Sequence, residues 1–199
     1  WNEIECTGQP SLTERDFTIN DKDWYELRKN APRIRLDEDD EIVTGGSCEV
    51  ITDSSNPCSV DSLEDTCFGD RAEDASRICN LESAGGRADV MSGTDLCRDG
   101  KSFSGGLWQI NLLVHADKVP GCNLTTQGQG SCKERTTNSN GLEYCAVWDC
   151  SFEGQEAEYN ECVEALKDAE TNTEIACQLY NDSGFQPWKN SADECGVSY

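Results

Sequence analysis

The stretch RICNLESAGG, residues 77–86, ends a run of helical periodicity and places Glu82 just before two glycines. Small and apolar residues recur upstream on the face that carries this glutamate: Ala72, Ala75, Ile78 and Cys79. Such spacing predicts a helix that begins near Asp70, which is able to cap it, and stops at Gly85 and Gly86.

Glu82 falls in the last turn of this expected helix, where the helix dipole disfavours negative charge. Its position beside Ile78 and Cys79 also predicts partial removal from water. Both effects raise the pKa of a carboxyl group, as a general acid near neutral pH requires. The competing interpretation is an ordinary surface glutamate at a helix end.

A second motif, SFSGGLWQIN at residues 102–111, joins two glycines to the amides of Gln109 and Asn111. Glycines allow a ligand to approach the backbone closely, and side-chain amides both donate and accept hydrogen bonds. They suit sugar hydroxyls and N-acetyl groups. A third motif, ACQLYNDSGFQPW at residues 176–188, groups Tyr180, Asn181 and Trp188, and its aromatic rings are able to stack on sugars or to pack in a core.

Two further helices are expected downstream. Apolar residues at helical spacing predict one over residues 155–168, and a capping box of Thr171 and Glu174 predicts another that ends near Gly184. Residues 122–150, rich in Gly, Asn, Thr and Cys, are expected to form a disulfide-tied loop.

The sequence before residue 70 has a different character. It favours a short helix at residues 23–29, strand-like pieces at 33–36 and 48–52, and a turn-rich linker at 53–62. We therefore predict an acidic, loop-rich extension of unknown role over residues 1–69 and a second domain over 70–199. The expected fold class is α+β, mostly α, and disulfide-stapled.

The chain contains 13 cysteines, spread over its whole length, and one histidine, His115. This pattern indicates disulfides in an oxidising, extracellular compartment, and it lacks the paired short spacings of a zinc site. We expect a secreted or cell-surface protein with no metal and no cofactor. The odd number leaves one cysteine free or bonded to another chain.

The net charge of −23 argues against nucleic acid and anionic membranes as partners, and the apolar stretches are too short to span a membrane. The acidic run LDEDDE at residues 36–41 is expected to be a solvated loop; a calcium site is the alternative. The start WNEIECTG is expected to be a mature end left after signal removal.

Three motifs in order, NLESAGG, GGLWQIN and ACQLYNDSG, resemble the lysozyme-like superfamily, which includes soluble lytic transglycosylases, goose-type lysozymes and c-type lysozymes. The resemblance covers about residues 70–195. It implies a secreted glycosidase that cleaves β-1,4 bonds of peptidoglycan or a related N-acetylated polysaccharide, with Glu82 as general acid. Family members place the counterparts of the following residues along the substrate: Ser104, Gln109, Asn111, Tyr180, Asn181 and Trp188.

The chain departs from the family in its second carboxylate. Ser104 stands where c-type lysozymes carry an aspartate, and Asp99 and Asp95 lie out of register, Asp99 being the better candidate. This leaves open a hydrolase that uses water or a transglycosylase that forms an anhydro sugar.

The acidic charge is a second departure, since many wall-lytic lysozymes are cationic. The alternative function is therefore a non-catalytic extracellular structural or filament subunit, self-associating through the N-terminal region or the odd cysteine. A carbohydrate-binding or inhibitor-like module is a third interpretation.

Overall fold

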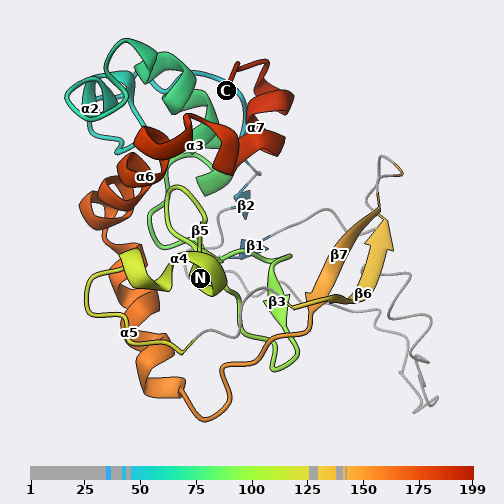
Figure 1. The fold of residues 1–199 in the computed structure, drawn as a ribbon. Coiled ribbons are helices and arrows are strands. Elements are labelled where there is room, and N and C mark those ends of the chain that lie inside the picture. Colours follow the sequence, from blue (N-terminus) through green and yellow to red (C-terminus); the bar gives the residue numbers. More distant parts are fainter. Residues whose placement is uncertain (1–34, 37–41, 44–45, 126–129, 138–140, 142) are drawn as a thin grey trace, which may run out of the picture. The chain divides into compact units, whose positions relative to one another are not determined.

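A computed structural model describes residues 35–36, 42–43, 46–125, 130–137, 141 and 143–199. These residues belong to one unit, Arg33–Tyr199, in which helices and short strands are mixed (Figure 1). The helices are α2 (Val60–Glu64), α3 (Ala72–Ser83), α4 (Leu112–His115), α5 (Glu156–Lys167), α6 (Ala169–Ser183) and α7 (Lys189–Cys195), with the 3-10 turns η1 (Gly69–Arg71), η2 (Ala116–Lys118) and η3 (Gln186–Trp188). The strands are β1 (Arg35–Leu36), β2 (Ile42–Val43), β3 (Leu96–Cys97), β4 (Ser104–Gly105), β5 (Ile110–Asn111), β6 (Cys132–Thr137) and β7 (Glu143–Trp148).

Helix α3 is the element that carries Glu82, and it packs against α2 and α7 (Figure 1). Its apolar stripe is fully buried, as the helical spacing predicts. Ala84 closes the helix in the left-handed conformation, with φ 54°, and two glycines follow at positive φ. The expected cap at Asp70 is wrong, because the turn η1 takes up that residue and α3 starts after it.

An aromatic cluster fills the core between α3 and α6. The Phe68 ring stacks on Trp108 with centroids 4.7 Å apart, and it also contacts Tyr180 at 4.9 Å. Phe185 and Trp188 extend the cluster toward η3. Burying one such ring contributes about 1.5–3 kcal/mol, so this cluster is a main source of stability for the helices around it.

Six disulfides link the described cysteines: Cys48–Cys195, Cys58–Cys79, Cys67–Cys177, Cys97–Cys150, Cys122–Cys162 and Cys132–Cys145. The first three join residues before position 70 to the helices after it. The expected boundary at residue 69 therefore falls inside one unit, whose core includes Phe68. The remaining cysteine, Cys6, lies outside the described residues, as does the helix expected at 23–29.

The expected linker at residues 53–62 is instead anchored to the core at Cys58 and Ser59, which are buried, while residues 53–55 are exposed. Cys58 is fully buried in its disulfide with Cys79, and the Ser59 hydroxyl caps α2 by accepting from the Ser62 N–H at 3.2 Å. The turn-rich composition here reflects a helix cap rather than a boundary between domains. The strand-like piece expected at 48–52 is only an isolated bridge between Ile51 and Ser59. Of the piece expected at 33–36, the structure describes Arg35–Leu36, which form β1.

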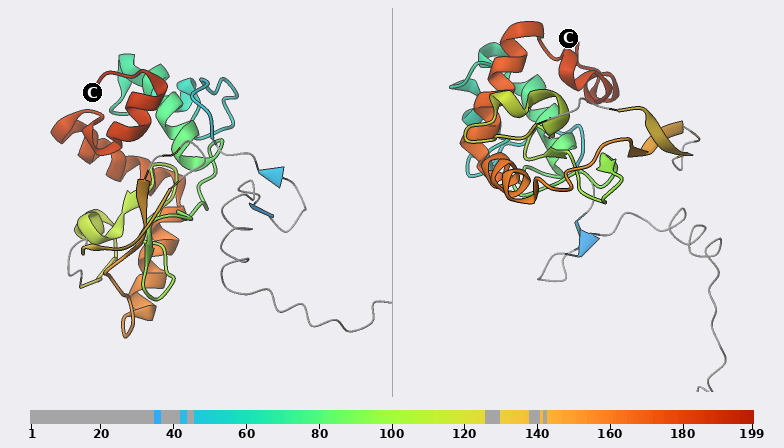
Figure 2. Two further views of the ribbon diagram at one scale, coloured as in Figure 1. Left: turned by 90° about the vertical axis from the view of Figure 1, so that its right-hand side faces the viewer. Right: turned by 60° about the horizontal axis from the view of Figure 1, so that its bottom comes forward.

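Residues 122–150 contain strands that the sequence analysis missed. β6 and β7 form an antiparallel pair (Figure 2). β7 also pairs in parallel with β3. The β6 sequence CKERTT is mostly exposed and has no apolar alternation, so local pattern does not mark it as a strand. The disulfide Cys132–Cys145 ties the two strands together.

The last helices agree better with expectation. α5 matches the predicted residues 155–168 closely, and α6 ends at Gly184 as predicted. Its start is two residues earlier than expected, because Asp168 rather than Thr171 is the cap and accepts from the Thr171 N–H at 2.8 Å. No helix in the described part of the chain is long and apolar enough to span a membrane.

Candidate active site

The carboxyl group of Glu82 lies at the end of α3, facing α7. Ser191 Oγ on α7 donates a hydrogen bond to Glu82 Oε1 at 2.5 Å. The residue keeps some exposure to solvent, while its carboxyl group is largely desolvated. Glu82 is thus held between two helices at the wall of a cleft, and it is not an ordinary surface glutamate.

Burial raises the pKa of Glu82 to about 7. The hydrogen bond from Ser191 opposes this effect, because it stabilises the ionised form, and the negative charges of Asp95 and Glu194 add to it. A carboxyl group with this pKa is protonated in about half of the molecules at neutral pH. It is therefore suited to both donating and accepting a proton there.

The cleft has a volume of about 350 Å³. It runs between the end of α3, the β4–β5 hairpin and the η3–α7 segment, with contributions from α4 and α6. Its lining residues are Glu82, Asp95, Ser104, Trp108, Gln109, Ile110, Asn111, His115, Leu179, Pro187, Trp188, Asn190 and Ser191. The lining thus combines two carboxyl groups, three side-chain amides, two hydroxyls and one imidazole, with two buried tryptophans behind them.

The loop between β4 and β5 lines the cleft, and hydrogen bonds from the side chain of Asn172 on α6 fix its position. The Asn172 side chain is fully buried, accepts from the Trp108 N–H at 2.9 Å and donates to the Gly105 carbonyl at 3.2 Å. Gly106 has φ +77°, and a Cβ atom there would lie 2.0 Å from Asn172 Nδ2. Only glycine fits, which explains the second glycine of the SGGLW motif.

Gln109 continues this loop in an unusual conformation, with φ 46°. Its side-chain amide donates to the Val90 carbonyl at 3.1 Å and to the Gly106 carbonyl at 3.0 Å. The amide therefore holds the loop against the segment before it. Asn111, like Gln109, both lines the cleft and stabilises the backbone near it. Its Oδ1 accepts from the Leu113 N–H at 2.9 Å and caps α4.

Asp95 is the second carboxyl group of the cleft. Burial raises its pKa, and a hydrogen bond with the Ser104 hydroxyl opposes the rise. Backbone contacts fix its position, since the Asp95 carbonyl accepts from the Phe103 N–H at 3.0 Å. The Ser104 hydroxyl thus lies beside the Asp95 carboxyl group.

Asp99, which the sequence analysis preferred as the second carboxylate, is not among the residues that line the cleft. Its carboxylate is exposed and accepts from the Phe152 N–H at 2.8 Å and from Ser151 Oγ at 3.3 Å. These bonds secure the segment that precedes α5. Asp99 therefore has a structural role, and Asp95 is the carboxyl group that lines the cleft together with Glu82.

The cleft brings together Ser104, Gln109, Asn111 and Trp188 with Glu82, but not Tyr180 or Asn181. Tyr180 packs in the aromatic core, its ring 4.8 Å from that of Phe185, and Asn181 is exposed. Successive residues of a helix point about 100° apart, so Leu179 faces the cleft while its neighbours turn away. The Trp188 indole is held in place by donating to the Trp108 carbonyl at 2.7 Å.

Three polar cleft residues were missed in the sequence: Ser191, Asn190 and His115. No motif marks them, because the first two reach the cleft only when α7 folds back onto α3. His115 is half-buried, and burial together with the charge of Lys118 lowers its pKa. Its place in α4, the short helix that follows the GGLWQIN motif, is the one local signal for it.

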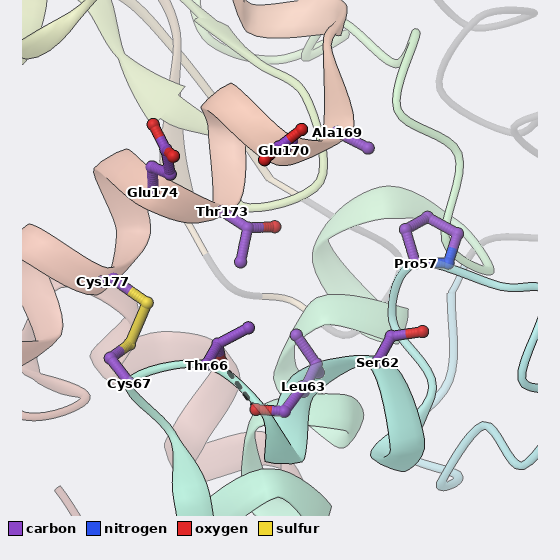
Figure 3. A pocket seen from close by; sticks show the side chains of 10 residues that line it. All are labelled: Pro57, Ser62, Leu63, Thr66, Cys67, Ala169, Glu170, Thr173, Glu174 and Cys177. Atoms are coloured by element: carbon purple, nitrogen blue, oxygen red, sulfur yellow. Dashed lines mark hydrogen bonds between the residues drawn. A yellow bond between two sulfur atoms is a disulfide. The ribbon is translucent and has the colours of Figure 1, made fainter.

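A larger pocket of about 500 Å³ lies between α2 and α6, with the Cys67–Cys177 disulfide at one end (Figure 3). Its charged side chains, Glu170 and Glu174, are both exposed. It offers no buried acid or base for proton transfer. The smaller cleft around Glu82 is therefore the stronger candidate for chemistry.

The described residues contain no group of three or more His, Cys, Asp or Glu side chains placed to hold a metal ion. Comparison of the chain with protein-family models, with curated proteins and with solved structures gave no match.

Proposed function

We propose that this protein is a glycosidase that cleaves the β-1,4 bonds of an N-acetylated amino-sugar polysaccharide. The observation that carries the proposal is Glu82, a desolvated carboxyl group with a pKa of about 7 in a cleft that also holds Asp95. Two carboxyl groups in different environments are the usual equipment of a glycosidase. The resemblance of three sequence motifs to the lysozyme-like superfamily supports the same assignment.

In this mechanism Glu82 is the general acid. Its protonated form donates to the oxygen of the bond that breaks, and the positive charge that develops on the sugar is stabilised by a carboxylate. Asp95 is assigned that second role because it is the other carboxyl group that lines the cleft; burial raises its pKa, and the hydrogen bond with the Ser104 hydroxyl opposes this rise. A second carboxylate in the cleft also favours attack by water over attack by the sugar's own hydroxyl, and hence a hydrolase.

The remaining lining suits a sugar chain. Asn111 and Asn190 offer amide donors and acceptors, whereas the Trp108 and Trp188 rings are buried in the core behind the cleft. Sugars expose both hydroxyls and apolar ring faces, so a lining of this kind binds without needing a charged ligand. N-acetyl groups are matched by the side-chain amides in the same way.

The decisive experiment measures release of reducing ends from purified peptidoglycan and from fully N-acetylated chitin oligosaccharides. Glu82→Gln keeps the shape and removes the proton, so we expect a loss of about 10²–10⁴-fold or more. Asp95→Asn is expected to lose activity strongly as well. Asp99→Asn is the matched control, because it removes a carboxylate that lies outside the cleft. The activity of this variant should stay within a few fold of that of the parent.

Equal activity of parent and Glu82→Gln would refute the catalytic role of Glu82. A parent with no activity on either substrate, over a range of pH and salt, would instead favour the structural or filament function. Non-reducing electrophoresis tests that alternative, because bonding through an odd cysteine would produce linked chains.

A further inference from the structure

Two N-glycosylation sequons occur in the chain, Asn123-Leu-Thr and Asn181-Asp-Ser, and the lining of the cleft includes neither of them. A sequon is modified only where the chain passes through a glycosylating secretory route. The six disulfides of the described residues fit an oxidising route of that kind. The local structure around the two asparagines differs, and this difference bears on which of them is the acceptor.

The segment that contains Asn123 is anchored at both ends to the region of α5. Before it, Cys122 forms a disulfide with Cys162 of α5. After it, the side chain of Gln155 accepts from the Thr125 N–H at 2.8 Å and donates to the Thr125 carbonyl at 3.3 Å. The position of the sequon in the folded protein is therefore fixed by contacts that leave the side chains of Asn123 and Thr125 unused.

Exposure to solvent alternates along this segment, as it does along an extended chain. Cys122 and Leu124 are half-buried, and Leu124 packs against the apolar core. Asn123 and Thr125 are exposed. The amide that receives the sugar and the hydroxyl that completes the sequon are thus both presented to solvent.

The amide of Asn123 is also compatible with a sugar after folding. Its Nδ2 donates to the Gly121 carbonyl at 3.1 Å. Nδ2 carries two hydrogens, and glycosylation replaces one of them, so the other remains available for this bond. During synthesis the segment is open as well, because Cys162 follows Cys122 by 40 residues and the disulfide closes only once both are present.

The second sequon lies in a regular helix. Asn181 and Ser183 belong to the last turn of α6, where residues two positions apart point about 200° away from each other. The Ser183 hydroxyl donates to the Leu179 carbonyl at 3.3 Å. Asn181 is exposed, but the helix separates its amide from the hydroxyl with which it has to be recognised.

We propose that Asn123, and not Asn181, carries an N-linked glycan. The glycan is transferred from an oligosaccharide joined to a polyprenyl diphosphate. Asn123 Nδ2 forms a bond to the anomeric carbon of the first sugar and loses one proton, while the bond from that carbon to the diphosphate oxygen breaks and the polyprenyl diphosphate leaves. The glycan is attached outside the cleft that holds Glu82.

The first test uses the whole chain, secreted from a eukaryotic cell line, and an amidase that removes N-linked glycans and converts the modified asparagine to aspartate. The parent should change its electrophoretic mobility once on this treatment, Asn181→Gln should change it equally, and Asn123→Gln should not change it. Treatment in heavy-oxygen water, followed by peptide mass spectrometry, distinguishes this conversion from spontaneous deamidation. We expect labelled aspartate at position 123 and unmodified asparagine at position 181.

The second test separates the sequon from the fold of the segment. Thr125→Ala removes the hydroxyl, whereas Thr125→Ser retains one, and both variants keep the backbone bonds to Gln155. The glycan should be lost in Thr125→Ala and retained in Thr125→Ser.

Thiol labelling of the same samples shows whether the disulfides have closed. A secreted, disulfide-bonded parent without a mobility change would overturn the proposal. A glycan on Asn181, or one that persists in Thr125→Ala, would overturn it as well. These results leave the glycosidase function standing, because both sequons lie outside the cleft.

Discussion

Glu82 should make the folded protein less stable as the pH rises, and Glu82→Gln should abolish that loss. Below pH 4.5, the ordinary value, the carboxyl group is protonated in both the folded and the unfolded chain. Between 4.5 and about 7 the unfolded chain releases this proton while the folded protein retains it. Stability therefore falls across this window, and the loss is complete once Glu82 ionises in the folded state.

The size of the effect follows from the two pKa values. A difference between about 7 and 4.5, at about 1.36 kcal/mol for each pH unit, corresponds to about 3 kcal/mol. Glutamine keeps the oxygen that accepts from Ser191 and carries no ionisable proton. The variant should match the parent in acid and exceed its free energy of unfolding by about 3 kcal/mol in alkali.

The assay is guanidinium unfolding with the disulfides intact, at about pH 5 and about pH 8.5, for the parent and for Glu82→Gln. Other groups also titrate over this range, so the quantity compared is the difference between the two proteins at each pH. Glu161→Gln, which removes an exposed carboxylate from α5, serves as the control. If the parent and Glu82→Gln lose the same stability, Glu82 is not a desolvated acid and its assignment is refuted, whatever the activity shows.

Three further predictions test the parts that hold the site. Ser191→Ala removes the hydrogen bond that stabilises ionised Glu82, so the pKa of Glu82 should rise further. The alkaline limb of the pH–rate profile should therefore shift to higher pH, by about one unit. Asn172→Ala leaves buried backbone groups without partners and should lower the free energy of unfolding by about 3 kcal/mol, measured by denaturant, whereas Asn181→Ala on the exposed face of α6 should change it by less than about 0.5 kcal/mol. Reduction of the six described disulfides should unfold the protein, because long-loop bridges contribute about 2–4 kcal/mol each, and an unchanged thermal midpoint in strong reductant would contradict this.

Elements governed by local pattern could be predicted from the sequence. The apolar stripes of α3 and α5 repeat over several turns, so their positions follow from helical periodicity to within a few residues. The SGGLW glycines marked the loop that approaches the cleft. The polar strand β6 could not be found in this way, because its stability comes from pairing with β7 and from a disulfide rather than from its own residues.

The choice between Asp95 and Asp99 shows why the site itself was harder to predict. The two aspartates flank the short strand β3, and only the path of the chain on either side of it decides which carboxyl group is buried in the cleft and which bonds to the segment before α5. Tyr180 was expected in the cleft because of the motif that contains it. In the structure its ring packs against Phe68 in the core instead.

By itself the sequence determined the glutamate at a helix end, the glycine-bearing loop, the disulfide-rich character and the acidic charge, because each is written in neighbouring residues or in composition. Tertiary structure alone decided that Ser191 and Asp95 meet Glu82, and that residues 46–69 share a core with the helices that follow. These contacts join residues far apart in the chain. They are set by how the helices pack and how the disulfides close, and no local pattern encodes either.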